Sequence, residues 1–116
     1  MTAISAISGN NAEHYKWENG SDGWYLLNSD LLSVIQERVP LRESECRHFH
    51  NNSQQFFYVL SGTAQIEISG ITYNVGRGHG IHIAAKEAHQ LKNSGSVDLE
   101  FLFVSEPMSH GDRVNT

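Results

Sequence analysis

Residues 47–62, RHFHNNSQQFFYVLSG, set the interpretation of the rest of this 116-residue chain. They carry a His-x-His pair, His48 and His50, ahead of an apolar run at 56–60. Successive side chains on a strand point to opposite faces, so the two histidines share a face about 7 Å apart along the chain. Two imidazoles on one face can approach a single divalent ion, whose bonds to nitrogen are about 2.0–2.1 Å long. A surface pair or a hydrogen-bonded core pair gives the same pattern, so metal binding needs a third ligand, and His89 is the natural candidate.

Short stretches rich in Val, Ile, Phe and Tyr recur on both sides of this segment. The predicted strands are residues 24–27, 31–39, 46–50, 56–60, 63–68, 71–75, 80–83, 89–93 and 97–104. The last one alternates clearly, with Leu99, Phe101 and Phe103 on one face and Glu100 on the other. Many short strands without an amphipathic helix predict an all-β sandwich or barrel.

The length fits a single domain. Residues 1–20 are polar, contain Asn-Asn and Asn-Gly, and show no sustained period, so we predict a loose N-terminal arm or an edge segment there. Residues 21–116 are predicted to form one β-barrel domain. The longest apolar run, 56–60, is far shorter than the about 20 residues that a membrane helix needs, so no membrane association is expected.

Charge and cysteine content exclude several classes of protein. A net charge of −5 argues against a nucleic-acid partner, because nucleic-acid surfaces are normally basic. A single Cys excludes an internal disulfide framework and a Cys-rich zinc module. The first residues lack the pattern of a signal peptide, and we therefore expect a cytoplasmic location. The one compositional excess is seven His, which directs attention to metal chemistry.

Two segments together resemble the motifs of the cupin superfamily. In the first, the His-x-His pair is followed by Gln55 and then, after six intervening residues, by Gly62. The second is GHGIHIAAKEAHQLKN, residues 78–93. The residues of this segment that stand in register with the cupin motif are Gly78, His89 and Asn93. The resemblance implies an all-β double-stranded β-helix, or jelly-roll, barrel.

The resemblance also implies a metal site. Its ligands would be His48, His50, His89 and, at the position where cupins carry an acid, Gln55. Gln54 competes for the fourth position, but Gln55 is favoured because it shares its strand parity with Phe57. A Gln offers one neutral oxygen, so the site would keep the full charge of the ion and bind it more weakly than a Glu site. We expect a divalent transition metal such as Mn, Fe, Ni or Zn.

Residues at inward-facing positions of the predicted strands are candidates for the lining of a pocket. The pocket candidates are Cys46, Phe57, Val59, Ile66, Phe101 and Phe103. Cys46 lies two residues before His48, so a continuous strand would turn it inward, where it lines the pocket or serves as a small buried apolar residue. The other five make any cavity apolar.

The resemblance leaves three functions open. The first is a metal-dependent enzyme acting on a small organic molecule by isomerase, lyase or oxygenase chemistry. The second is a non-catalytic metal-dependent binding or sensing module, which the lack of an identifiable general base favours. The third is a structural cupin with a vestigial site. Small cupins commonly pair through the N-terminal strand and a sheet face, so we also expect a homodimer.

Overall fold

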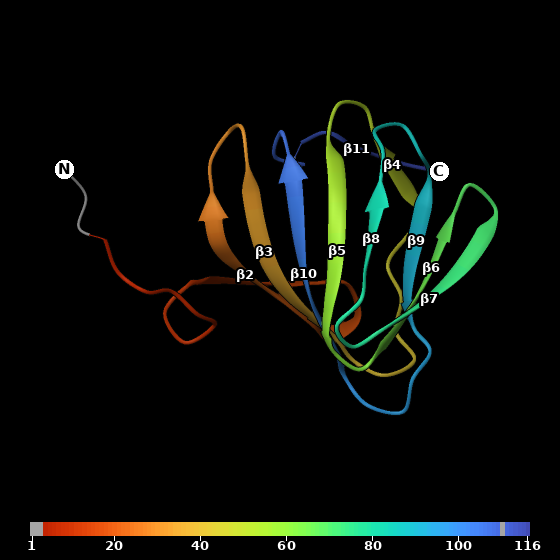
Figure 1. Cartoon of the computed structure of the whole chain (residues 1–116), viewed down its shortest axis with the longest axis horizontal. Coiled ribbons are helices and arrows are strands. Elements are labelled where there is room, and N and C mark those ends of the chain that lie inside the picture. The colour runs from red at the N-terminus through yellow and green to blue at the C-terminus, as the bar shows by residue number, and fades with distance from the viewer. Residues whose placement is uncertain (1–3, 110) are drawn as a thin grey trace.

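The computed structural model describes residues 4–109 and 111–116. Their strands form two antiparallel sheets that face each other (Figure 1). The six-stranded sheet has the order β1-β2-β3-β10-β5-β8, and the five-stranded sheet has the order β11-β4-β9-β6-β7. From β3 onward the chain passes from one sheet to the other at each connection except the β6–β7 hairpin.

The strand bounds follow for the two sheets. In the first sheet they are β1 (Glu13–Trp17), β2 (Ser21–Asn28), β3 (Ser33–Val39), β5 (Gln54–Ser61), β8 (Gly80–Ile83) and β10 (Leu99–Glu106). In the second they are β4 (His48–His50), β6 (Thr63–Ile68), β7 (Ile71–Gly76), β9 (His89–Asn93) and β11 (Arg113–Asn115). A single 3-10 turn, η1 (Glu18–Gly20), joins β1 to β2 among the described residues.

This architecture confirms the predicted all-β jelly-roll barrel. Within residues 4–109 and 111–116 there is no α-helix, and therefore no helix long and apolar enough to cross a membrane. The β6–β7 hairpin shows how the local sequence produces the fold. Ala64, Ile66 and Ile68 are buried on alternate positions of β6, and the tight turn at Gly70 has φ 91°, a conformation that glycine adopts without strain.

The hydrophobic core lies between the two sheets. Its buried side chains are Ile35, Val39, Phe57, Val59, Ala64, Ile66, Ile68, Val75, Ile83, Leu91, Leu99, Phe101 and Phe103. Both sheets contribute to it because each presents one apolar face. The core reaches the predicted metal ligands through Phe57, whose ring centroid is 6.2 Å from that of His89.

The structure contains two strands, β1 and β11, that the sequence does not predict. β1 and β11 were not predicted, because both are short and mostly polar, and pairing with a neighbouring strand rather than an alternating pattern holds them in place. β1 lies inside residues 1–20, for which a loose arm or an edge segment is predicted, and it pairs with β2 along its whole length at the edge of the six-stranded sheet. The residues described before β1 extend away from the two sheets (Figure 1).

The strand predicted at 46–50 is shorter than expected. β4 begins only at His48, because the preceding chain is held by other contacts: Ser44 forms an isolated bridge with Lys92, and the backbone N–H of Glu45 donates to the Leu91 carbonyl. Strand alternation therefore does not extend back to Cys46.

Candidate metal centre and pocket

Three histidines converge at one end of the core. His48 and His50 stand two residues apart on β4, and His89 opens β9 as the register partner of His48. All three side chains are buried, and one ligand atom from each lies within 4.8 Å of the others. Two metal–nitrogen bonds of about 2.0–2.1 Å span at most about 4.2 Å, so a small rotation of the rings would bring all three atoms onto one ion. The group can therefore hold a single metal ion.

Backbone carbonyls fix the orientation of two of these rings. His48 Nδ1 lies 2.9 Å from the Cys46 carbonyl oxygen, and His89 Nδ1 lies 3.0 Å from the Glu87 carbonyl oxygen. Because a carbonyl only accepts, each Nδ1 carries the hydrogen and each Nε2 keeps its lone pair. His89 Nε2 is buried and has no hydrogen-bond partner among the described residues. Both imidazoles thus present a lone pair to the centre of the cluster.

Burial also keeps these imidazoles neutral. It lowers the pKa of His48 to about 3, and it lowers the pKa of His89 as well. The hydrogen bonds to Cys46 and Glu87 act in the opposite direction but are outweighed. A neutral imidazole is the form that coordinates a cation.

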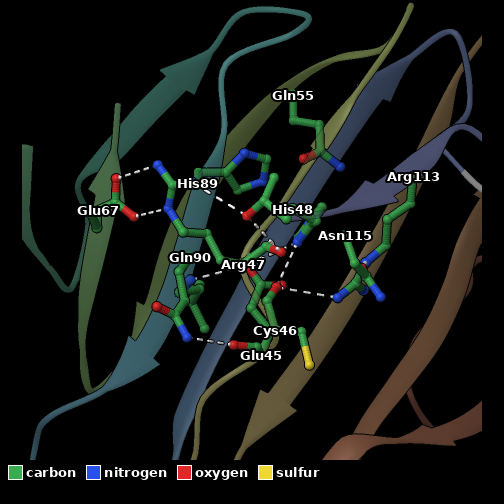
Figure 2. Close-up of polar contacts among 12 residues, drawn as sticks. Glu45, Cys46, Arg47, His48, Gln55, Glu67, His89, Gln90, Arg113 and Asn115 are labelled. Atoms are coloured by element: carbon green, nitrogen blue, oxygen red, sulfur yellow. Dashed lines mark hydrogen bonds and ion pairs between the residues drawn. The ribbon is translucent and has the colours of Figure 1, made fainter. Parts of the chain in front are cut away.

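Gln55 faces the same cluster from the opposite sheet (Figure 2). Its side chain is buried, and its Nε2 donates to Ser105 Oγ at 3.1 Å. In this arrangement Oε1 is buried with no hydrogen-bond partner in the described part of the chain. An unpartnered amide oxygen beside imidazole lone pairs fits a cation, so the residues present suit a metal ion.

A cavity of about 240 Å³ opens beside the cluster. The predicted ligands on its wall are His48, His50 and Gln55. Its aromatic lining consists of Tyr15, Trp17, Phe57 and Phe103. Its charged lining consists of Glu37, Glu45 and Arg113. The cavity therefore combines a predicted cation site, flat apolar walls and ionisable groups.

The two carboxyl groups on the wall are in different surroundings. Glu45 accepts a hydrogen bond from the Leu91 backbone N–H at 3.0 Å, and its Oε2 lies 4.0 Å from His48 Nδ1. Glu37 accepts a hydrogen bond from the Tyr15 hydroxyl at 2.6 Å. Burial raises the pKa of each carboxyl to about 8, against the lowering effect of these hydrogen bonds. Both carboxyls can therefore carry a proton near neutral pH.

The sequence-based candidates fall into three groups. The structure brings together the four predicted ligands and the pocket residues Phe57 and Phe103. Three further pocket candidates are buried in the core but do not line this cavity: Val59, Ile66 and Phe101.

The prediction that Cys46 faces inward is wrong. It is exposed and does not line the cavity, and Figure 2 shows its sulfur pointing away from the imidazoles. The physical reason is that β4 begins only at His48, so the strand parity assumed for Cys46 does not apply.

The sequence analysis missed the ionisable residues of the pocket. Strand parity would have found Glu37, because it alternates with the buried Ile35 and Val39 along β3. No local pattern points to Tyr15 or Arg113, which come from the two strands that were not predicted.

Comparison with known proteins agrees with this geometry. The family model described as the cupin domain matches residues 36–105. The uncharacterized protein MJ1618 of Methanocaldococcus jannaschii is 31% identical over 81 residues, which are 69% of this chain and 65% of that protein. The polyketide synthase CurC of Streptomyces cyaneus is 26% identical over 70% of this chain and 51% of its own length.

Among solved structures, the polyketide cyclase RemF of Streptomyces resistomycificus shares the fold. Its TM-score is 0.83 at 19% identity, with coverage of 98% of this chain and 86% of that chain. The chain spans only about half to two-thirds of the two curated relatives. The family match over residues 36–105, more than half of the sequence, shows that this chain belongs to the cupin family.

Proposed function

We propose that this cupin binds one divalent transition-metal ion and a small organic molecule beside it. The ligands would be His48, His50, His89 and Gln55. The observation that carries this proposal is the cluster of three buried imidazoles, two of them kept neutral by burial, next to the unpartnered Gln55 Oε1. Nitrogen and neutral oxygen donors suit Mn, Fe, Ni or Zn.

The pocket supplies the remaining requirements of a binding site. A bound ion would polarise an oxygen atom of the organic molecule as a Lewis acid. Phe57, Phe103 and Trp17 offer flat apolar surface to the rest of that molecule and exclude water from it. Two of the relatives are named for polyketide synthesis, which supports a small, carbonyl-bearing molecule as the ligand class.

Elemental analysis tests the metal site. We expect about one equivalent of a transition metal per chain in untagged protein purified without chelators. His48→Ala should lose it, and Gln55→Glu should bind it more tightly, because a carboxylate adds a negative charge. His79→Ala is the matched control, since His79 is exposed in a turn outside the cluster. Absence of metal even after loading would contradict the proposal and leave a structural or metal-free binding cupin.

The proposal includes a homodimer. It is supported by apolar side chains that this chain leaves exposed: Phe56 and Tyr58 on the outer face of β5, and Ile4 and Ile7 ahead of β1. Burying such surface against a second copy is favourable. Light scattering at micromolar concentration should give twice the mass of one chain, and a monomer would contradict the homodimer.

A cytoplasmic location is proposed as well. Its support is the single Cys46, which is free and exposed and cannot form a disulfide within the chain. Immunodetection in cell fractions tests this location, and recovery of the protein outside the cytoplasm would contradict it.

A further inference from the structure

Three residues stand side by side across β1, β2 and β3, on the face that turns toward the cavity. Tyr15 on β1 is the register partner of Gly23 on β2, and Gly23 is the register partner of Glu37 on β3. We call Tyr15, Gly23 and Glu37 the inner row. Its two ends, Tyr15 and Glu37, line the same cavity as the predicted metal ligands.

The absence of a side chain at Gly23 allows Tyr15 and Glu37 to contact each other. The Tyr15 ring lies over it: a Cβ atom added at position 23 would lie 2.1 Å from Tyr15 Cζ and 2.5 Å from the Tyr15 hydroxyl oxygen. Only glycine leaves this space open. Through it the Tyr15 hydroxyl crosses the middle strand and donates to Glu37 Oε2 at 2.6 Å. The pair is therefore built by three strands together.

Glu37 lies on the inward face of β3, between two buried apolar side chains of the same strand. It alternates with the buried Ile35 and Val39 on β3, and its register partner on β10 is Phe101. A partly buried carboxyl in such surroundings is costly unless it has partners. Packing alone does not account for this residue, whereas a role in the adjoining cavity does.

The groups around Glu37 shift its pKa in both directions. Burial raises its pKa to about 8. The Tyr15 hydrogen bond lowers that pKa, Glu45 before β4 raises it, and Arg113 on β11 lowers it. Tyr25 on β2 has its own pKa raised by burial and by Glu37, so it stays neutral. A carboxyl balanced in this way both accepts and releases a proton near neutral pH, as general acid–base catalysis requires.

We propose that Glu37 is the proton-transfer residue of this pocket, that Tyr15 is its positioning residue, and that the substrate is a small carbonyl compound with an acidic C–H bond next to the carbonyl group. This inference rests on the proposed function, which supplies the ion beside the carbonyl oxygen. An aromatic α-keto acid meets all three features of the cavity. Its two adjacent oxygens suit a cation, its ring suits the aromatic walls, and its CH₂ group supplies the proton.

The reaction is a redox-neutral tautomerisation. The Glu37 carboxylate takes the proton from the carbon next to the carbonyl group. The electron pair of the broken C–H bond forms a C=C bond, and the π pair of the carbonyl moves to its oxygen. That oxygen then receives the proton from the Glu37 carboxylic acid, which gives the enol and restores the carboxylate. No oxidant, reductant or second substrate is needed, and the same steps run in reverse.

Phenylpyruvate is the probe for this inference. Its enol absorbs in the ultraviolet, so the rate of conversion to the keto form is read directly against protein-free buffer containing the same metal. We expect acceleration by the metal-loaded chain and a loss of about 100-fold or more in Glu37→Gln, the range typical of removing a general acid or base. Glu100→Gln is the matched control, because Glu100 lies between inward-facing Leu99 and Phe101 and so points outward.

Tyr15→Phe separates positioning from mere folding. It removes the hydrogen bond that lowers the Glu37 pKa, so the pH–rate profile should move to higher pH with a smaller loss of rate. An unmoved profile would overturn the role of Tyr15.

Metal content measured on the same samples separates the two proposals. A metal-loaded wild-type chain that gives no acceleration, or a Glu37→Gln rate equal to the wild-type rate, would overturn this inference and leave the metal site standing. A chain that takes up no metal would contradict the proposed function, and this inference with it.

Discussion

The two faces of the β1–β2–β3 ribbon carry acids with opposite behaviour, one residue apart along each strand. The inner row is Tyr15, Gly23 and Glu37, and the outer row is Lys16, Asp22 and Arg38. In the outer row, Arg38 forms ion pairs with Asp22, and Lys16 Nζ lies 3.3 Å from the same carboxylate. In the inner row, the hydrogen bond to the Glu37 carboxyl within the described residues comes from the Tyr15 hydroxyl. The same three strands thus support an ion-pair network on one face and a protonatable carboxyl on the other.

The pKa values of Asp22 and Glu37 shift in opposite directions because the two carboxyls have different partners. Burial alone raises the pKa of Asp22, but hydrogen bonds from Arg38, His14 and Lys16 outweigh it and lower that pKa to about 2. Burial also raises the pKa of Glu37, and one Tyr15 hydrogen bond leaves it at about 8. Hydrogen bonds from three cationic or polar partners set the sign at Asp22, whereas burial sets the sign at Glu37. The outer row is therefore built for stability and the inner row for proton exchange.

Gly23→Ala should have the largest effect on stability, because the new methyl group would collide with the Tyr15 ring. We expect a loss of about 1–3 kcal/mol in the free energy of unfolding, as for an overpacked site. Urea unfolding measures it. In a Tyr15→Ala background the ring is absent, so the same substitution should be neutral or stabilise the chain by about 0.5 kcal/mol. An equal cost in both backgrounds would contradict the steric origin of the inner row.

Asp22→Asn and Glu37→Gln form a matched pair for the next comparison. Asp22→Asn removes the charge that Arg38 and Lys16 contact, so we expect a loss of about 1–2 kcal/mol after allowance for the exposure of these cations. Glu37→Gln replaces an acid that folding keeps protonated at pH 7, although the unfolded chain would ionise it, by a neutral amide of the same shape, so stability at pH 7 should rise by about 1–2 kcal/mol. Urea unfolding of both variants at pH 7 measures the difference, and a larger loss in Glu37→Gln would reverse the assignment of the two rows.

Part of this arrangement could be predicted from the sequence. The His-x-His spacing and the position of His89 identified the cluster, because strand alternation is a local rule and the cupin motifs are read in register. The β6–β7 hairpin followed from alternation and Gly70. Glu37 could have been assigned to the pocket by its parity with Ile35.

The rest could not be predicted because it depends on pairing between strands. Tyr15 contacts Glu37 because the strand register places Gly23 between them. The sequence of β1 alone does not indicate this register. The inward orientation expected for Cys46 failed for a related reason, since contacts of Ser44 with another strand end the alternation before β4 begins. Non-local contacts decided both cases.

The two acids also predict opposite pH dependence of stability. An acid whose pKa is lowered on folding contributes stability above its unfolded value, about 4, and loses it as the pH falls toward 2. An acid whose pKa is raised on folding contributes stability below about 4.5 and loses it as the pH rises toward 8. Asp22→Asn should therefore flatten the acid limb of the stability curve, and Glu37→Gln should reduce the slope between pH 4.5 and 8. Denaturant midpoints across pH 2–9 check both, and an unchanged slope in Glu37→Gln would show that Glu37 titrates normally.

The smallest expected effect is the change in carboxyl pKa on metal loading, and it distinguishes the two rows most directly. Glu37 lines the cavity beside His48 and His50, whereas Asp22 lies on the opposite face of the ribbon. Loading Zn²⁺ should therefore lower the Glu37 pKa, by up to about one unit, since a nearby cation favours the charged carboxylate. The Asp22 pKa should not move, because its own cations already surround it. Carbon-13 NMR of the labelled carboxyl carbons measures both, and His48→Ala should abolish the Glu37 shift. Equal shifts in the two acids would mean that the rows are not electrostatically separate, and the division between a stabilising face and a reactive face would fail.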